Sequence, residues 1–416
     1  MTVWQPIDDG YADLTSHDTF VAGVPHNTFA RLRREDPVHW TEWDGGRGFW
    51  SITRHADIKA MNRQHARYSS ARGIRMEDQT YEEYLARRTF QETDPPEHAQ
   101  TRLRVHRAFT KGAVAAFEDE IRALCVDILD QALEQASFDA TKAIARELPM
   151  RMLGRIIGVP DADLPWLVEK GDALIANTDP DFTTHVLDKM DTDEFRMMPF
   201  NSPAGAELYA YARELMRAPN PDRGVIATIL APDAKGETMS EQEFRNFFCL
   251  LVAAGNDTTR YSIAAGIQAL CYQGELLAQM RESAIDWKLA ADEIVRWATP
   301  ALYFRRTVTE DHELHGKRLR AGDKLLYWFA SANRDETVFD EPFRVDLARN
   351  PNPHLSFGQY GPHVCLGMWL AKLEVQVLFQ ELSRRVATIE PAGEQQFLRS
   401  NFVGGLKRLP VQITRT

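Results

Sequence analysis

Residues Ser356–Gly367 constrain the possible fold more than any other part of the sequence. This stretch holds three glycines, one proline, one histidine and one cysteine. Gly358 and Gly361 permit a sharp backbone path, and the proline fixes its own φ, so the loop is predicted to be rigid. From residue 366 to residue 382, large apolar residues recur at three- and four-residue spacing, which predicts a buried helix. We therefore expect a rigid loop that presents Cys365 just before the N-terminus of a buried helix.

The expected position of Cys365 favours a thiolate. A helix N-terminus offers backbone N–H groups without intrahelical partners and a partial positive charge, and both favour the ionised form of a nearby thiol. The charge of a metal-bound sulfur would be moderated there as well. The alternative interpretation is a buried structural thiol, the usual role of an intracellular cysteine. A cysteine hydrolase with His363 as its base is disfavoured, because residues two apart on a tight turn rarely face each other.

A second constraint is a helix that is too apolar to lie on the surface. Ser240 and Glu243 form a capping-box pattern, and the residues from 247 to 254 are all apolar apart from one cysteine. The sequence therefore predicts a helix that crosses the core. In its middle lies Ala254-Gly-Asn-Asp-Thr-Thr-Arg260, where a glycine and two threonines weaken the backbone hydrogen bonds. Buried acidic and hydroxyl groups need a partner or a purpose. The structural alternative is a helix kink in which Asp257 caps or forms an ion pair.

A third pattern points to an anion. Asp94-Pro-Pro-Glu97 is predicted to open a helix whose next turns are basic. His98 and Arg102 lie one helical turn apart, so they project from the same face and could bind an anionic group together. For Arg102 alone, a solvated surface cation is the default interpretation.

Composition narrows the class of function. A hydrophobic content of 44% with 26% charged residues is typical of a soluble globular protein, and the net charge of -11 argues against a general nucleic-acid binder. The four cysteines show no C-x-x-C spacing, which argues against a zinc site or a disulfide framework. The N-terminal residues carry neither a basic stretch nor an apolar run, and no window of about twenty apolar residues follows. We expect a cytoplasmic protein without a membrane anchor.

Together these patterns resemble the cytochrome P-450 family. The cysteine stretch is similar to the family's haem-thiolate loop, Phe-Gly-x-Gly-x-His-x-Cys-x-Gly, at Phe357, Gly358, Gly361, His363, Cys365 and Gly367. Gln359-Tyr360 stands where the common form has one residue, and this longer loop resembles some bacterial members that act on terpenoids, branched lipids or sterols. The middle of the apolar helix resembles the family's oxygen-binding element, Ala-Gly-x-Asp-Thr. Glu293 to Arg296 resembles its structural Glu-x-x-Arg element.

The resemblance implies a fold. It is mainly α with smaller β-sheets (α+β), built as one domain over residues 1–416. The β-rich parts are expected at about 37–57, 301–330 and 386–416, and the remainder is helical. Within the first part, alternation around a central Asp-Gly-Gly itself predicts a β-hairpin over Val38–Thr53, and Leu398–Ile413 is predicted to form a second hairpin. Haem b would be buried between the core-crossing helix and the helix that follows the cysteine loop.

The resemblance also implies roles for individual residues. Cys365 would bind the haem iron. The haem propionates would be bound by His98, Arg102, Arg306 and His363, with Arg305 as the alternative to Arg306. On the opposite side of the haem, Thr258 would hold a water at the oxygen site and Asp257 would relay protons from solvent.

The implied activity is that of a haem-thiolate monooxygenase, which inserts one oxygen atom of O₂ into a C–H bond of a small apolar substrate such as a terpenoid, steroid, branched lipid or alkyl aromatic. Electrons would come from a separate ferredoxin and its reductase, and Arg102, Arg104, Lys372 and Arg384 could form a basic docking face. Two alternatives are a peroxide-using haem-thiolate enzyme and a non-catalytic haem-thiolate ligand-binding protein. The Asp257-Thr258 pair argues against both, because neither needs a proton relay.

Overall fold

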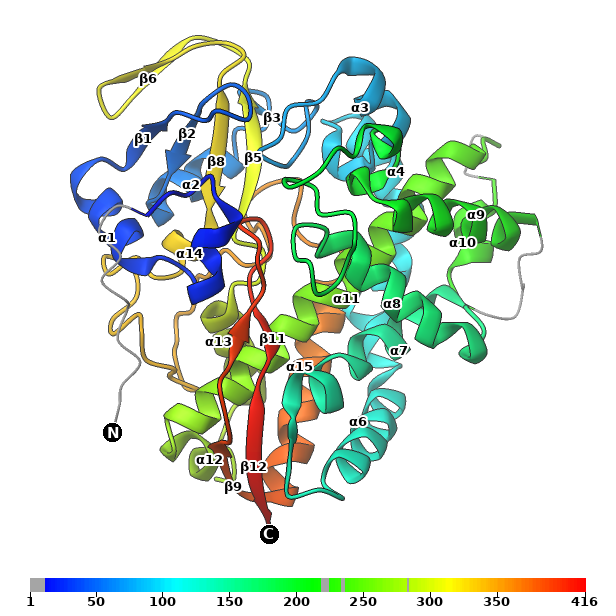
Figure 1. Ribbon diagram of the computed structural model, residues 1–416, viewed down its shortest axis with the longest axis vertical. Helices are drawn as coiled ribbons and strands as arrows, with labels where there is room; N and C mark the ends of the chain where they lie inside the picture. The colour runs from blue at the N-terminus through cyan, green and yellow to red at the C-terminus, as the bar shows by residue number, and fades with distance from the viewer. Residues whose placement is uncertain (1–11, 218–223, 233–235, 283) are drawn as a thin grey trace.

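The computed structural model describes residues 12–217, 224–232, 236–282 and 284–416 (Figure 1). Helices dominate the architecture. Their bounds are α1 His26–Glu35, α2 His55–Asn62, α3 Tyr81–Arg87, α4 Glu97–His106, α5 Lys111–Ala115, α6 Glu118–Ala132, α7 Glu147–Ile157, α8 Leu164–Ile175, α9 Pro203–Arg217, α10 Ile226–Leu230, α11 Glu241–Tyr272, α12 Glu275–Gln279, α13 Trp287–Ala298, α14 Phe329–Ala332 and α15 Met368–Arg385.

The strands are short and form small sheets. Their bounds are β1 Val38–Thr41, β2 Phe49–Ile52, β3 Tyr68–Ser69, β4 Ser137–Asp139, β5 Tyr303–Val308, β6 His312–Leu314, β7 Lys317–Leu319, β8 Lys324–Trp328, β9 Val386–Pro391, β10 Gln396–Phe397, β11 Leu406–Arg408 and β12 Pro410–Arg415. The largest sheet has the order β1-β2-β8-β5-β3, and a second has the order β4-β12-β9. The strands fall within the predicted β-rich parts except for β3 and β4, so the expectation of a mainly helical fold with smaller sheets is confirmed.

The longest helix, α11, runs through the middle of the molecule and packs against α7, α8, α9 and α13 (Figure 1). It begins with the predicted capping box: the Glu243 N–H donates to Ser240 Oγ at 3.2 Å, and the Ser240 N–H donates to Glu243 Oε2 at 2.8 Å. Most of its side chains are buried, as the apolar run predicts. The helix therefore crosses the core, and its middle lies deep inside the protein.

The main apolar core takes side chains from both ends of the chain, from Leu14 to Ile413. A smaller cluster, including Val38, Ile58 and Tyr327, packs around the five-stranded sheet. The N-terminal hairpin was predicted correctly, because Val38 pairs with Ile52 and Thr41 pairs with Phe49 in antiparallel register. The predicted C-terminal hairpin is partly wrong: β10 pairs with β11, but β12 leaves the hairpin and joins β9.

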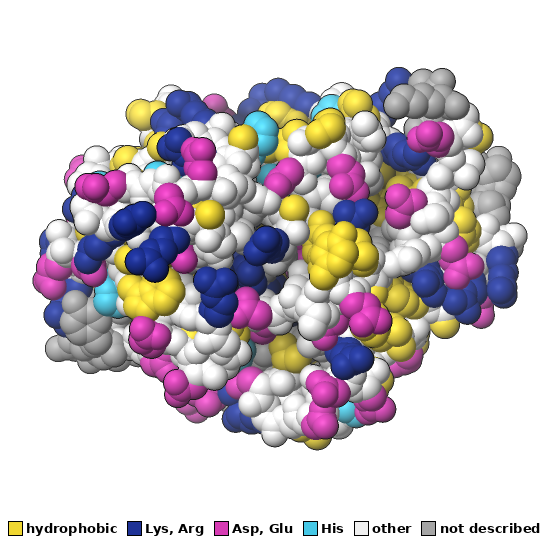
Figure 2. Space-filling model, turned by 90° about the horizontal axis from the view of Figure 1, so that it is seen from above, with side chains coloured by type: hydrophobic (Ala, Val, Ile, Leu, Met, Phe, Trp, Pro, Cys, Tyr) yellow, Lys and Arg dark blue, Asp and Glu magenta, His cyan; other side chains and the backbone are white. Residues whose placement is uncertain are grey.

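The surface carries charges of both signs. In the view from above, Lys and Arg side chains alternate with Asp and Glu side chains and with apolar groups (Figure 2). This face therefore offers no continuous basic surface of the kind that phosphate backbones require. Among the described residues, no helix is both long and apolar enough to cross a membrane.

Candidate active site

Cys365 lies two residues before the N-cap of α15, as the sequence predicts. Its backbone N–H donates to the Phe357 carbonyl at 2.9 Å, which closes the loop. Its side chain is exposed although protein surrounds it, so it opens on an internal space. Burial raises the pKa of the thiol, whereas backbone N–H groups of Gly367 and Met368 and the charge of Arg102 lower it. The thiolate would therefore be stabilised by a helix N-terminus and by one nearby cation.

The two loop glycines serve different purposes. Gly358 has a φ of 62°, which a residue with a side chain rarely adopts. Gly361 instead lies so close to α2 that a Cβ would come within 2.3 Å of the Asn62 carbonyl oxygen. The additional residue of the loop places Tyr360 at a φ of 76°, with Lys59 Nζ 4.6 Å from its ring centroid. The loop is thus anchored on α2, and Phe357 stays buried.

The middle of α11 exposes one face although the helix lies inside the molecule. Ala254 is exposed and Thr258, one turn later, is half-buried, whereas Ala253 and Asp257 are buried. The Thr258 hydroxyl donates to the Ala254 carbonyl at 3.0 Å, within a helix that stays continuous from Glu241 to Tyr272. An interior helix face without side-chain cover lines a space, and Thr258 supplies a hydroxyl to it.

Four cationic or titratable side chains gather beside the cysteine loop. The rings of His98 and His363 are 4.3 Å apart between centroids. Burial and the charge of Arg102 lower the pKa of His98 to about 4. Burial and the charge of Arg306 hold the pKa of His363 far below its usual value. Within the described part of the chain, neither Arg102 nor Arg306 forms an ion pair with a carboxylate.

This cluster is short of negative charge. Arg306 is 7% exposed, and among the described residues its one hydrogen bond, from Nη1, goes to the Arg305 carbonyl at 2.7 Å. Buried guanidinium groups are normally paired, because an uncompensated charge in the interior is costly. Two carboxylates of a bound group would supply the missing charge. The donor set therefore fits the two propionates of haem.

The neighbouring Arg305 has a different environment. Its Nη1 donates to Asp78 Oδ1 at 3.2 Å and to the Glu77 carbonyl at 3.0 Å. Successive residues of β5 point to opposite faces of the sheet, so only one of the two arginines can reach the cationic cluster. Arg305 already has a carboxylate partner, and the geometry favours Arg306 for an additional anion.

Asp257 belongs to a buried ionic network that the sequence did not reveal. Arg260 Nη2 lies 2.9 Å from Asp257 Oδ1, and Arg260 Nη1 donates to Asp172 Oδ1 of α8. Arg146 contacts the same Asp172, with its Nε donating to Oδ2 at 2.8 Å. The second oxygen of Asp257, Oδ2, has no hydrogen-bond partner among the described residues. Burial raises the pKa of Asp257 to about 7, although the charge of Arg260 lowers it.

A solvent-open hollow of about 230 Å³ reaches this network from the surface. Its lining includes Arg146, Asp172, Arg260 and Lys407. The structural alternative for Asp257, an ion pair, is thus present in the molecule. This ion pair can also carry a proton. One carboxylate oxygen has no hydrogen-bond partner among the described residues, the pKa is near neutrality, and solvent reaches the partner residues. Asp172 could not be recognised from sequence, because spacing along the chain did not link α8 to α11, whereas Arg260 follows Asp257 by three residues on the same helix.

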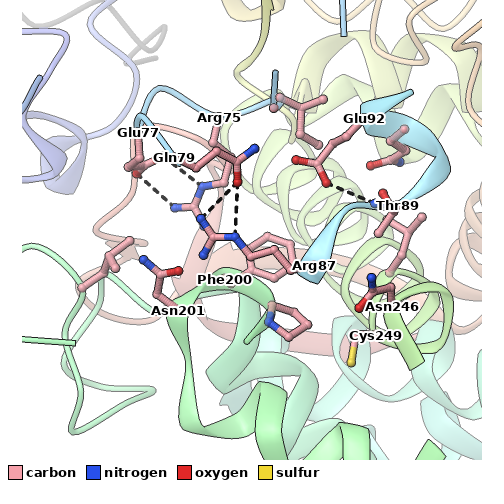
Figure 3. Close-up of a pocket in the computed structure, with 16 residues that line it drawn as sticks. Arg75, Glu77, Gln79, Arg87, Thr89, Glu92, Phe200, Asn201, Asn246 and Cys249 are labelled. Atoms are coloured by element: carbon pink, nitrogen blue, oxygen red, sulfur yellow. Dashed lines mark hydrogen bonds and ion pairs between the residues drawn. The ribbon is translucent and has the colours of Figure 1, made fainter. Parts of the chain in front are cut away.

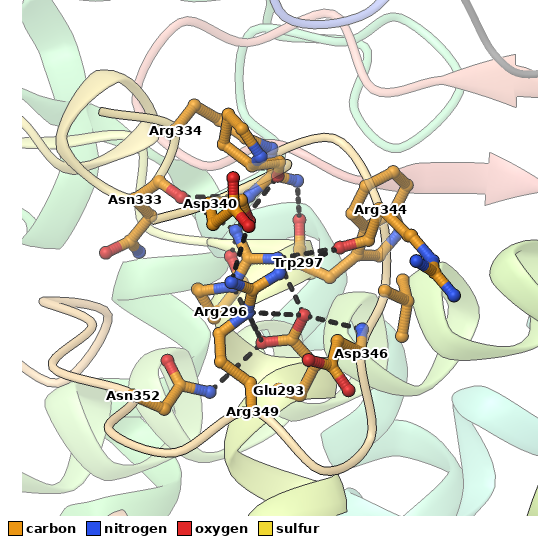
Figure 4. Close-up of polar contacts among 12 residues, drawn as sticks. Glu293, Arg296, Trp297, Asn333, Arg334, Asp340, Arg344, Asp346, Arg349 and Asn352 are labelled. Atoms are coloured by element: carbon orange, nitrogen blue, oxygen red, sulfur yellow. Dashed lines mark hydrogen bonds and ion pairs between the residues drawn. The ribbon is translucent and has the colours of Figure 1, made fainter. Parts of the chain in front are cut away.

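The Glu293–Arg296 pair has a fuller set of polar partners (Figure 4). Both side chains are 0% exposed, and Arg296 Nε and Nη2 donate to the two Glu293 oxygens at 2.7 Å each. Glu293 also accepts from Arg349 Nε at 3.2 Å and from Asn352 Nδ2 at 3.0 Å. The arginine donates to the carbonyls of residues 333, 342 and 344. The element ties α13 to the loop that leads into the cysteine stretch, which suits a structural role.

The four cations considered for a docking face do not form one exposed group. The charge of Arg102 interacts with Cys365, and Lys372 Nζ pairs with Asp292 at 2.5 Å. Arg384 pairs with Glu381 at 2.9 Å, twelve residues further along α15. Only part of this set can therefore meet a partner protein.

Comparison with known proteins agrees with this site. The family model described as Cytochrome P450 matches residues 288–403. The chain is 32% identical to a steroid C26-monooxygenase of Mycolicibacterium smegmatis, covering 98% of this chain and 94% of that protein. It is 36% identical to a methyl-branched lipid omega-hydroxylase of Mycobacterium bovis, covering 93% and 91%. A solved cytochrome P450 of Mycobacterium marinum in complex with pseudoionone superposes with a TM-score of 0.86 at 31% identity, covering 99% and 100%.

The similarity extends over nearly the whole of both chains, and its level is high enough to show common descent and not only a shared fold. Membership of this family implies haem as the cofactor and O₂ as the co-substrate, and the anion-deficient cluster beside Cys365 agrees with that cofactor. The protein is a member of the cytochrome P450 family of monooxygenases.

Proposed function

We propose that this protein inserts one oxygen atom of O₂ into a C–H bond of a small apolar substrate, a steroid, branched lipid, terpenoid or alkyl aromatic, with haem b as its cofactor. The observation that carries the proposal is the cationic cluster without carboxylate partners beside a cysteine at a helix N-terminus. The names of the steroid and branched-lipid relatives support the substrate class.

The chain's own residues would divide the work as follows. Cys365 binds the iron as a thiolate, and Arg102, Arg306, His98 and His363 hold the propionates. When bound, the haem supplies the activation of oxygen and its transfer to carbon.

On the α11 side, the Thr258 hydroxyl orders a water at the exposed face of the helix. Asp257 receives protons from the solvent-open hollow through the Asp172 and Arg260 network and passes them towards that water. A pKa of about 7 suits this role, because a relay group must both accept and release a proton near neutral pH. Exchange requires the Asp257–Arg260 contact to open transiently.

Electrons would come from a separate ferredoxin and its reductase. The surface at α4 and α5 suits docking, because Leu103 is 69% exposed and Arg107 and Lys111 are exposed beside it. Lys111 Nζ lies 5.3 Å from the ring centroid of Trp369, near the start of α15. An apolar centre with basic neighbours would attract an acidic electron carrier and orient it.

The test of the thiolate assignment is spectroscopic. The reduced carbon monoxide complex of the haem-loaded protein should show the red-shifted band that marks thiolate ligation, and Cys365→His should abolish it. An unchanged band in the variant would remove Cys365 from the iron.

The test of the activity compares electron sources. Turnover with reduced ferredoxin and O₂ should exceed turnover with hydrogen peroxide. With isotopically labelled O₂, one labelled oxygen atom should appear in the product. Efficient turnover with peroxide alone would favour the peroxide-using alternative. Binding without turnover under either condition would favour a ligand-binding protein.

A further inference from the structure

A second group of charged side chains lines a pocket away from the cysteine loop. This pocket lies between residues 73–92, the loop 187–201 and the first half of α11 (Figure 3). Part of its wall is apolar, with Ile74, Leu187, Phe200 and Leu250. Four ionisable side chains also line it: Arg75, Glu77, Arg87 and Glu92. None of them is among the residues assigned above to haem binding or proton movement, so their presence in a partly apolar pocket needs an explanation.

The two guanidinium groups lie next to each other in this pocket (Figure 3). Arg75 Nε is 3.3 Å from Glu77 Oε2, so its charge is compensated. Arg87 has only neutral acceptors within the described part of the chain: its Nε and Nη2 donate to Gln79 Oε1 at 3.2 and 3.1 Å, and its Nη1 donates to the Arg196 carbonyl. Burial lowers the pKa of Arg87, and the charge of Arg75 adds to that effect. Of the two adjacent cations, only Arg75 is thus ion-paired with a carboxylate among the described residues.

The fourth group, Glu92, does not fully restore the balance. It forms no ion pair among the described residues, and its Oε2 accepts from the Thr89 N–H at 3.2 Å. Burial raises the pKa of Glu92, which favours its neutral form. The Glu83 and Glu92 charges do act on Arg87, but only through space. The pocket therefore keeps an excess of positive charge at Arg87, where a bound carboxylate would be favourable.

The helix that carries the candidate oxygen site also contributes to the wall of the pocket. Cys249 and Leu250 line it, and Thr258 is nine and eight residues further along the same helix. At 1.5 Å per residue, this separation is about 12–14 Å along the α11 axis. An extended aliphatic chain of medium length would span it.

We propose that the substrate is an apolar chain that ends in a carboxylate, which binds to Arg87 beside Arg75, and that oxygen is inserted towards the opposite end of the chain. This inference rests on the proposed monooxygenase function and adds the identity of one end of the substrate. The bound carboxylate would replace part of the hydrogen bonding between Arg87 and Gln79. The Arg75–Glu77 ion pair and the apolar wall would stay unchanged.

The experiment uses the haem-loaded protein with dodecanoic acid, its methyl ester and 1-dodecanol. Affinity is measured from the haem absorption change and, independently, by titration calorimetry at one pH and salt concentration. The acid should bind at least about tenfold more tightly than the ester, as expected for one charge-assisted hydrogen-bonded pair. In Arg87→Gln this preference should disappear. The matched control is Arg88→Gln, since Arg88 pairs with Glu97 at 3.0 Å outside the pocket, and it should retain the preference.

Glu92→Gln supplies a second variant that does not depend on the folding of Arg87→Gln. It removes the residual negative charge, so the preference for the acid should increase at pH 8. Equal affinities of acid and ester in the wild-type protein, or an undiminished preference in folded Arg87→Gln, would overturn the proposal. Turnover of the bound acid should give products oxidised near the methyl end, and oxidation next to the carboxylate would contradict the proposed orientation. A carboxylate preference that survives without any turnover would leave this site intact and instead refute the monooxygenase function.

Discussion

Two acid–arginine pairs with the same spacing occupy helices of this protein, and they differ in how completely their charges are satisfied. In Glu293-x-x-Arg296, the carboxylate accepts from Arg296, Arg349, Asn352 and the Asp346 N–H. In Asp257-x-x-Arg260, one carboxylate oxygen has no partner and the arginine is shared with Asp172. The pKa of Glu293 is lowered despite its burial, by its hydrogen bonds and the Arg296 charge, whereas burial raises that of Asp257 to about 7.

The difference shows what separates a structural ion pair from a reactive one. A saturated pair has no free lone pair to receive a proton and no reason to open, so it can only hold elements together. An unsaturated pair beside a solvent-open hollow can exchange protons and return to the same geometry. Spacing along the helix does not distinguish the two, and the surrounding donors do.

The largest effect is expected on the stability of the protein when the carboxylate of the saturated pair is removed. Glu293→Gln leaves Arg296 and Arg349 without their buried anion, which should cost about 3–5 kcal/mol in the free energy of unfolding. Chemical denaturation of the haem-loaded protein measures this loss. Glu341→Gln, which breaks the exposed pair with Arg344, is the matched control and should cost far less. Equal losses of unfolding free energy in the two variants would mean that the full set of hydrogen-bond partners around Glu293 does not give this pair its structural role.

A smaller effect extends the comparison to the arginines of β5. Arg306→Ala should speed haem dissociation by roughly one to two orders of magnitude, because a charge-assisted contact to a carboxylate is worth about 1.5–3 kcal/mol. Arg305→Ala breaks the Asp78 pair and should leave haem dissociation near the wild-type rate. Transfer of haem to an acceptor protein gives both rates. Wild-type dissociation in both Arg306→Ala and Arg102→Ala would remove the proposed propionate clamp.

The smallest stability effect is a difference in pH dependence. A folded-state pKa of Asp257 near 7, above its ordinary value, means that its contribution is complete in acid and is lost as the pH rises through 7. Asp257→Asn cannot ionise, so its stability relative to wild type should increase by about 1 kcal/mol between pH 6 and pH 8. The pKa of Glu293 is lowered, so its contribution is present at neutral pH and is lost only in acid. Melting curves between pH 6 and pH 8 should therefore show a rising relative stability for Asp257→Asn and a pH-independent difference from wild type for Glu293→Gln, and parallel trends would contradict the assigned environments.

Local patterns predicted much of this fold. The capping box at Ser240, the loop before α15 and the first hairpin depend on residues close together in sequence, and each was found where the pattern indicated. The network around Asp257 was missed because Asp172 and Arg146 lie on other elements, and no periodicity links them to α11. The sequence could not choose between Arg305 and Arg306 either, since that choice depends on which face of β5 meets Asp78.

Asp257 and Thr258 are proposed to deliver the protons for oxygen activation. The most direct test is the ratio of oxidised product to NAD(P)H consumed, measured on haem-loaded wild type, Thr258→Ala and Asp257→Asn with one accepted substrate. Thr258→Ala should lower this ratio and release the electrons as hydrogen peroxide. Asp257→Asn should slow turnover and increase the solvent isotope effect, with less uncoupling. A wild-type rate and wild-type coupling in both variants would contradict proton delivery by Asp257 and Thr258.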